Sequence, residues 1–281
     1  MKKLQKIFVI EALFYLTTLL LGIYVTLQID KLIPQAVAWS GSQEAPTVTG
    51  FVLYFLVATL IIYLISKSKR LEKGRKVFFK AAFFLSVIFG GLITLSAFTF
   101  DLLAAIIIII LVLAWQREPI ILLHNSLISI SIAGIGAVMG AQFSPLIIAV
   151  LLALFSIYDF IAVYKTKHMV KMAGEMIKTG AIMGLVIPFS FFGLLDNLED
   201  KSRGEFMVLG GGDLAFPLFL TSSVTLHYGT GYALILSGFV LLGLFGSFLL
   251  FTGQKEKEPI PALPPIALGS LVGYLFILIL I

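Results

Sequence analysis

The chain has 281 residues, of which 59% are hydrophobic and only 12% carry a charge, and its formal net charge is +5. Soluble domains carry about 25% charged residues, so this composition excludes a soluble globular protein and indicates an integral membrane protein. The chain has no cysteine, which excludes disulfide scaffolds, thiolate catalysis and Cys-ligated metals. The basic residues fall in short segments between apolar runs, so we expect no nucleic-acid partner.

Apolar runs predict nine membrane-spanning helices, because a helix needs roughly 20 apolar residues to cross the hydrocarbon core. The first run follows Lys2, Lys3 and Lys6 and is too long for a signal-peptide core, so we interpret it as a retained span. The predicted fold is an all-α polytopic membrane protein. The predicted spans are residues 7–29, 48–66, 77–98, 101–115, 119–140, 144–164, 208–227, 230–251 and 263–281.

Residues 180–195 are apolar but short, with Gly184 and Pro188 inside the run, so they fit a tenth span, a re-entrant piece or a strand. With nine spans, 19 of the 20 basic residues fall on the cytoplasmic side and only Lys31 falls outside. A tenth span would change this to 15 against 5. The positive-inside rule therefore favours nine spans, with a cytoplasmic N-terminus and an external C-terminus.

This topology divides the chain into three parts: six spans in residues 1–164, a cytoplasmic-side loop in residues 165–209, and three spans in residues 210–281. Within the loop, apolar residues recur at helical spacing from 169 to 177 and predict an amphipathic helix at the interface, continuing span six. Residues 182–187 fit a strand better than a span.

Two aspartates interrupt apolar runs: Asp159 in residues 145–164, and Asp213 in residues 210–226. A charged side chain at membrane depth costs about 2.5–3.5 kcal/mol on insertion scales, so such residues usually mark function. The predicted topology places both carboxyl groups at one level, with Asp159 about 9 Å from the cytoplasmic interface. Close carboxyl groups share one proton over a range of pH, so one can activate water while the other donates to a carbonyl oxygen. This is the chemistry of aspartic proteases.

The residues around the aspartates fit such a site. Gly210, Gly211 and Gly212 remove side chains where a substrate backbone must approach closely, and they allow non-helical dihedral angles. Tyr158 precedes the first aspartate and is a candidate hydrogen-bond donor into the site.

Three segments, Tyr158–Asp159, Gly210–Asp213 and Pro261–Leu263, resemble the Y-D, G-x-G-D and P-A-L motifs of the presenilin and signal peptide peptidase family. Members of that family are intramembrane aspartyl proteases with nine spans. Each motif alone is common, but here they occur in order, in spans six and seven and at the start of span nine. The resemblance covers about residues 150–281 and is closest to a stand-alone microbial, archaeal-type presenilin homologue.

The resemblance implies that Asp159 and Asp213 are the catalytic pair and that the turn of Pro261, Ala262 and Leu263 packs beside them and helps hold substrate. The implied substrates are transmembrane helices, cleaved within the lipid bilayer by a multi-pass protein of the cell membrane, with no cofactor or metal. The loop of 45 residues from 165 to 209 is much shorter than in animal presenilins. We therefore expect no obligatory partner subunit and leave open a homo-oligomer.

A helical substrate must unwind before water can attack, and the unwound chain then needs new backbone partners inside the membrane. We expect residues 182–187, including Leu185 and Val186, to supply a strand edge to the substrate, with Ala262 and Leu263 on its other side.

The alternative to a protease is a proton-coupled secondary transporter that uses the two aspartates as a proton relay. The single glycine break and the absence of an evident repeat weigh against it. A scaffold that binds transmembrane segments without cleaving them is disfavoured because both acids are present.

Other polar residues in the spans receive a structural interpretation. Glu11 lies about one turn from Lys6 and is expected to reach the lipid headgroups. His124 and Asn125 are expected to bridge helices.

Overall fold

The structure is a computed structural model that describes residues 2–32, 50, 53, 57, 72–198, 206–254 and 259–281. The span predicted at 48–66 lies outside the described residues, apart from three single positions. In chain order the elements are α1 (Lys2–Leu32), α4 (Glu72–Ser96), α5 (Asp101–Arg117), α6 (Ile121–Gln142), α7 (Pro145–Phe160), η2 (Ile161–Lys165), α8 (His168–Thr179), β1 (Gly184–Pro188), η3 (Phe192–Leu195), β2 (Phe206–Gly210), α9 (Gly211–Tyr228), α10 (Thr230–Thr252) and α11 (Leu263–Leu280).

Among the described residues, six helices are long and apolar enough to cross a membrane. They are α1, α4, α6, α7 with η2, α10 and α11, and they coincide with six of the predicted spans. Helices also occupy two further predicted spans, but α5 has only 17 residues, and α9 begins at Gly211 rather than at residue 208. The helical, polytopic architecture is therefore confirmed, and the count of nine spans stays a prediction.

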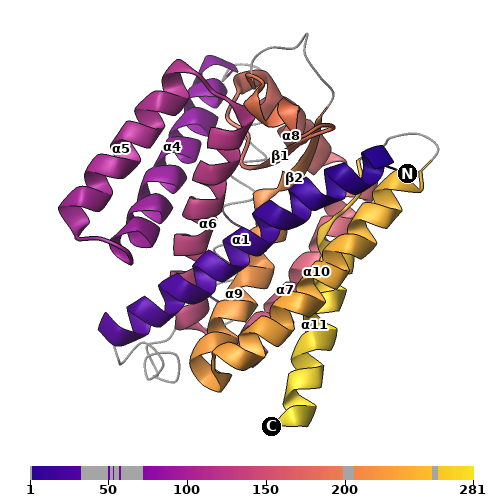
Figure 1. Ribbon diagram of the computed structural model, residues 1–281. Coiled ribbons are helices and arrows are strands. Elements are labelled where there is room, and N and C mark those ends of the chain that lie inside the picture. The colour runs from indigo at the N-terminus through magenta and orange to yellow at the C-terminus, as the bar shows by residue number, and fades with distance from the viewer. Residues whose placement is uncertain are drawn as a thin grey trace.

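Helix α6 lies at the centre of the bundle and packs against α1, α4, α9 and β1 (Figure 1). Its spanning window is 61% buried, against 33–44% in the other five candidate spans. Small residues let its neighbours approach closely. A Cβ atom on Gly134 would collide with the carbonyl oxygen of Gly90 in α4, and one on Gly140 would lie 2.7 Å from the carbonyl oxygen of Phe219 in α9. Contacts of this kind are typical of helices packed within a membrane.

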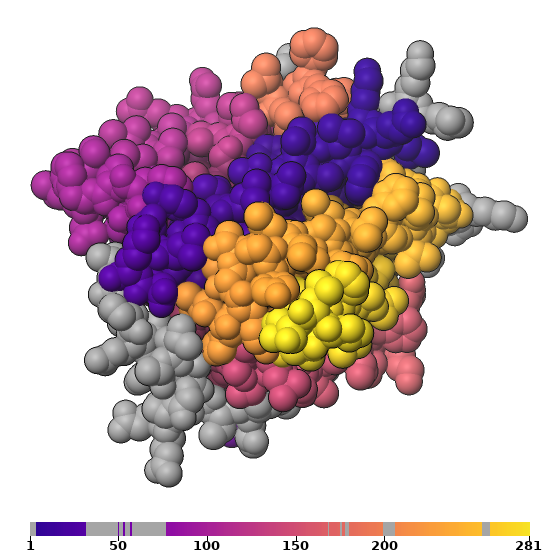
Figure 2. Space-filling view, turned by 60° about the horizontal axis from the view of Figure 1, so that its bottom comes forward, coloured from indigo at the N-terminus to yellow at the C-terminus, as the bar shows by residue number. Residues whose placement is uncertain are grey.

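Helix α1 crosses the bundle and lies between α4 and α5 on one side and α10 and α11 on the other (Figure 2). It packs against α6, α9 and α10. A Cβ atom on Gly22 would collide with Leu218 of α9, so these two helices are in close contact. This contact brings the first span of the chain to the helix that carries Asp213.

The prediction of an all-α protein is wrong in one respect, because β1 and β2 form an antiparallel two-stranded sheet. Gly184 pairs with Gly210, Leu185 with Leu209, Val186 with Val208 and Ile187 with Met207. The strand predicted at 182–187 is thus confirmed, whereas residues 208–210, which were predicted to begin span seven, form its partner strand. Pairing satisfies the backbone polar groups of two short apolar segments that are too short to span the membrane.

The amphipathic helix of the loop is confirmed as α8, but it does not continue the sixth span. Between η2 and α8, Lys167 adopts a left-handed conformation with φ of 52°, which ends one helix and starts the next in a new direction.

The N-terminus of α1 lies at the same end of the bundle as α8, β1 and β2, and the C-terminus lies at the opposite end (Figure 1). The topology predicted from the basic residues requires the same relative arrangement, with the loop and the N-terminus on one side.

Candidate active site

The first aspartate is buried near the end of a spanning helix. Asp159 is the penultimate residue of α7 and is only 6% exposed. The next turn, η2, is a π-helix from Ile161 to Lys165. Wide turns of this type occur frequently at functional sites, because the extra residue changes the direction of neighbouring side chains.

The second aspartate sits in the first turn of its helix. Gly210 is the N-cap of α9, so Asp213 occupies the third helical position, where an acid can accept a hydrogen bond from the N-cap backbone. The backbone N–H of Gly210 bonds to the Asp213 carboxylate in this way. A Cβ atom on Gly210 would lie 3.0 Å from Oδ2 of Asp213, so a larger residue would press on the carboxylate.

The three glycines before Asp213 do not adopt backbone conformations that require glycine. None of Gly210, Gly211 and Gly212 has a positive φ, so it is the missing side chain that matters at these positions. Gly210 and Gly212 are exposed and Asp213 is half-buried, so the surface around the acid is bare backbone.

The structure brings the two aspartates together. Their carboxyl groups lie close enough to interact electrostatically. One turn before Asp159, the ring of Phe155 stacks on that of Phe216, one turn after Asp213, with centroids 4.4 Å apart. This aromatic pair fixes α7 against α9 next to the acids.

The Pro-Ala-Leu turn contacts the first aspartate directly. The backbone N–H of Leu263 donates to Oδ2 of Asp159 at 3.3 Å. Leu263 is the first residue of α11, and Pro264 and Pro265 after it have no N–H group. The Asp159 carboxylate therefore meets the start of α11 as Asp213 meets the start of α9, and helix N-termini favour negative charge.

Sequence reasoning missed a residue of α1 that supports Asp213. The carbonyl oxygen of Asp213 would normally accept a helical hydrogen bond from residue 217, but residue 217 is proline and has no N–H. The hydroxyl group of Tyr15 donates to this oxygen at 2.7 Å. A tyrosine from the first span thus replaces the hydrogen bond that the proline removes. Pro217, four residues after Asp213, was the sequence signal that a donor from elsewhere was required.

Glu11 also lies in this region, and the expectation that it reaches the headgroups is wrong. Glu11 is only 3% exposed, one turn from Tyr15 on α1, and its Oε2 atom has no hydrogen-bond partner. It is near enough to Asp213 to interact with it electrostatically. An acid within a predicted span could have been flagged for this reason, because buried acids in membranes are costly.

The remaining predicted site residues lie around this centre. Tyr158 is half-buried beside Asp159. Pro261 is buried and Ala262 half-buried in the turn before α11. Leu185 and Val186 are fully buried in β1, next to β2, which runs directly into α9.

The site as built can perform acid–base chemistry on a carbonyl group. Two carboxyl groups lie together inside the bundle, and one that is ionised can take a proton from water while the other donates one. Among the described residues no group of three or more acids and histidines is placed to hold a metal ion.

Comparison with known proteins identifies the family. The sequence model described as "Signal-peptide peptidase, presenilin aspartyl protease" matches residues 6–281. The chain belongs to this family. It is an intramembrane aspartyl protease, that is, an aspartic endopeptidase in a multi-pass membrane protein. The transporter alternative has no support from the comparisons.

Two solved structures of a presenilin family intramembrane aspartate protease have the same fold. The one in space group C222 has a TM-score of 0.64 and 18% identity, and the match covers 98% of this chain and 99% of that one. The one in space group P2 has a TM-score of 0.58 and 21% identity, and the match covers 94% and 97%. Among curated proteins no match is found.

Proposed function

We propose that Asp159 and Asp213 are the catalytic pair of this protease and hold one proton between them. The observation that carries the proposal is their arrangement: two interacting carboxyl groups, one at the start of α11 and the other at the start of α9. The ionised member takes a proton from water, and the water attacks the peptide carbonyl carbon. The protonated member donates to the carbonyl oxygen, so a tetrahedral diol forms without a covalent enzyme intermediate.

The supporting residues act on this pair. Leu263 holds the Asp159 carboxylate through its N–H, and Pro261 and Ala262 shape the turn that presents this group. Gly210 and Gly212 leave room for the substrate backbone, and Gly211 continues the same bare surface. Tyr158 supplies a hydroxyl group beside Asp159.

The substrate is the unwound end of a transmembrane helix, and it binds as an added strand. The prediction that β1 itself offers the edge needs correction, because both edges of β1 are occupied: β2 pairs with one, and Asn125 bonds to Val186 at the other. Leu185 and Val186 therefore belong to the inner, buried strand of the sheet, which holds β2 in position. The edge available to a substrate is that of β2, which among the described elements packs mainly against β1 and α9.

The residues of β2 fit this role. Its first three residues and Gly210 are partly or fully exposed, whereas β1 is buried throughout. Gly210 ends the strand and begins the turn to Asp213, so a chain paired with β2 runs toward the catalytic pair.

The topology that goes with this function has nine spans, with the N-terminus and the loop 165–209 in the cytoplasm, the C-terminus outside, and the three parts 1–164, 165–209 and 210–281 as its units. The protein works in the cell membrane without an obligatory partner subunit.

A transition-state analogue of aspartic proteases, with a hydroxyl group in place of the scissile carbonyl, tests the pairing. It should bind the purified protein and inhibit cleavage of a single-span substrate, and Asp159→Asn or Asp213→Asn should each abolish binding while the protein stays folded. A single variant that binds the analogue as tightly as the parent would exclude a shared role.

A further inference from the structure

The outer edge of β1 is closed by two adjacent side chains of α6. The Asn125 amide donates from Nδ2 to the carbonyl oxygen of Val186 at 2.8 Å, and its Oδ1 accepts from the Val186 N–H at 2.8 Å. Nε2 of His124 donates to the carbonyl oxygen of Gly184 at 3.1 Å. One side chain that both donates to and accepts from the same residue reproduces the pairing that a neighbouring strand would make.

Burial and aromatic packing hold these side chains in position. Both are fully buried. The His124 ring lies parallel to that of Phe83, with centroids 5.7 Å apart and 2° between the planes, and at 6.0 Å from Trp115. Because a carbonyl oxygen only accepts, Nε2 must carry the hydrogen, and the other ring nitrogen has no partner.

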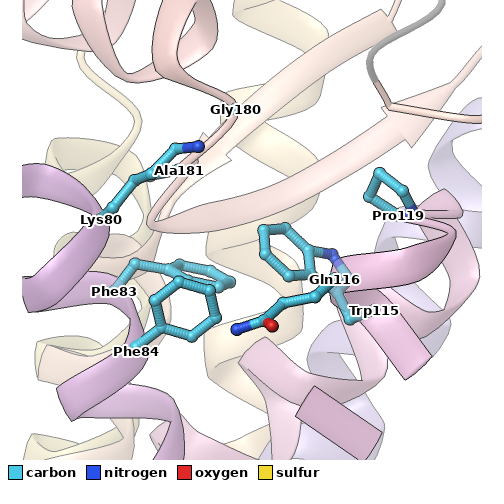
Figure 3. Close-up of a pocket in the computed structure, with 8 residues that line it drawn as sticks. All are labelled: Lys80, Phe83, Phe84, Trp115, Gln116, Pro119, Gly180 and Ala181. Carbon is cyan, nitrogen blue, oxygen red and sulfur yellow. The ribbon is translucent and has the colours of Figure 1, made fainter. Parts of the chain in front are cut away.

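The aromatic support of His124 borders a cavity of about 340 Å³ (Figure 3). Phe83 and Trp115 form one wall of it, and Gly180 and Ala181, which lead toward β1, form another. The cavity thus lies beside His124 and Asn125, which together we call the clamp. Some of its lining residues, such as Gln116, can be changed without removing the hydrogen bonds of the clamp.

The hydrogen bonds of the clamp show which backbone groups of the sheet point to which edge. In an antiparallel pair the polar groups of successive residues point to opposite edges. Since those of Val186 point to Asn125, the residues that bond to β2 are Leu185 and Ile187, paired with Leu209 and Met207. By the same alternation, the N–H and C=O groups of Val208 point away from β1, toward the edge of β2 that no other described strand occupies.

We propose that His124 and Asn125 are positioning residues that occupy the outer edge of β1, so that an unwound substrate pairs only with β2 and in one register relative to Asp213. The proposal rests on the proposed addition of the substrate strand. The clamp occupies the backbone groups of β1 with which a substrate strand could otherwise pair. It also holds β1 in position, so that β1 remains paired with β2. A slip of one residue would turn every side chain of the added strand to the other face.

Paired substitutions separate positioning from mere packing. Asn125→Leu keeps the number of side-chain heavy atoms and their branching and removes both hydrogen bonds. His124→Leu is compared with His124→Gln, whose amide retains a donor. Ser126→Ala, at the next position of α6, is the matched control, because the Ser126 hydroxyl group donates to the Leu122 carbonyl oxygen within the same helix. Each variant is purified in detergent, and the transition-state analogue confirms an intact catalytic pair.

Asn125→Leu should raise KM for a single-span substrate about fivefold to tenfold and leave kcat within about twofold. This is the effect expected when the enzyme–substrate complex loses about one net hydrogen bond. Mass spectrometry of the products should show cleavage spread over neighbouring peptide bonds. His124→Leu should behave in the same way, His124→Gln should recover most of the parent's KM, and Ser126→Ala should match the parent.

The experiment separates the positioning role of His124 and Asn125 from the addition of the substrate strand to β2. If Asn125→Leu leaves KM and cut sites unchanged while Val208→Pro on β2 impairs cleavage, the clamp has no positioning role, although strand addition stands. If Val208→Pro itself has no effect, strand addition to β2 is wrong. If Asn125→Leu or His124→Leu also loses binding of the analogue, the substitution has disturbed the catalytic pair, and His124→Gln then decides. The clamp stands if His124→Gln binds the analogue and keeps the parent's cut sites, and it is wrong if His124→Gln spreads the cut sites as His124→Leu does.

Discussion

Removal of the Tyr15 hydroxyl group should leave the carbonyl oxygen of Asp213 without a donor. Pro217 has no N–H to offer this oxygen, and the Tyr15 hydroxyl group supplies its hydrogen bond at 2.7 Å. Tyr15→Phe keeps the ring and removes only this bond. An unsatisfied buried acceptor costs about 1–3 kcal/mol, so the loss of this part-buried bond should lower the free energy of unfolding by an amount near the lower end of that range. The start of α9, and with it the Asp213 carboxylate, should become less well ordered.

The assay is thermal unfolding in detergent combined with turnover of a single-span substrate. The unfolding temperature should fall by about 2–4 °C for each kcal/mol lost. Tyr274→Phe is the matched control, because Tyr274 is also buried but its hydroxyl group, within the described part of the chain, meets only that of Tyr228, at a long 3.5 Å. It should lose much less stability and little activity.

A second substitution makes the reasoning refutable. Pro217→Ala restores an N–H group that can bond to the Asp213 carbonyl oxygen within the helix. In that background Tyr15→Phe should cost less, with a coupling of about 0.5–3 kcal/mol between the two sites. Equal losses with and without Pro217 would show that the tyrosine does not replace the missing helical hydrogen bond.

Three further predictions concern the surroundings of the acids and the topology. Gly210→Ala should reduce turnover strongly, because its Cβ atom would lie 3.0 Å from Oδ2 of Asp213. Gly238→Ala should be neutral in the same assay, because among the described residues no atom beyond its own stretch of helix lies within 4 Å of the added Cβ. Glu11→Gln should leave the unfolding temperature unchanged near about pH 3 and raise it near about pH 8, because ionisation of a buried acid opposes folding only above its unfolded-state titration, which is near about pH 4. An advantage that shrinks as the pH rises would contradict this. In the chain, which has no native cysteine, Thr166→Cys and Gly231→Cys should react with an impermeant thiol reagent from opposite sides of the membrane, and labelling from one side would refute the nine-span topology.

The sequence predicted those features that depend on local pattern. Apolar length located the spanning helices, the period of the residues from 169 to 177 located α8, and the three motifs located the two aspartates and the turn before α11. The run 182–187 was recognised as a strand because the apolar stretch 180–195 is short, contains Gly184 and Pro188, and would break the positive-inside rule as a tenth span.

What the sequence did not predict depends on contacts between distant segments. Residues 208–210 of β2 were merged into span seven, because an apolar strand and the apolar start of a helix look alike until the partner strand is known. Tyr15 and Glu11 lie about 200 residues from Asp213 in the chain, and only the packing of α1 against α9 brings them to it. His124 and Asn125 were expected to bridge helices, and instead they bond to the edge of a strand.

If Asp159 and Asp213 act as one pair, replacing either of them by asparagine should abolish turnover. Asp159→Asn, Asp213→Asn and the control Asp101→Asn, at the exposed start of α5, are each reconstituted in lipid vesicles with a single-span substrate and assayed across pH. Both pair variants should lose cleavage while their unfolding temperatures stay at or above that of the parent, since an acid inside the bundle is removed. The control should keep a rate that falls on both sides of a pH optimum. Near-normal cleavage by either Asp159→Asn or Asp213→Asn would contradict the pairing.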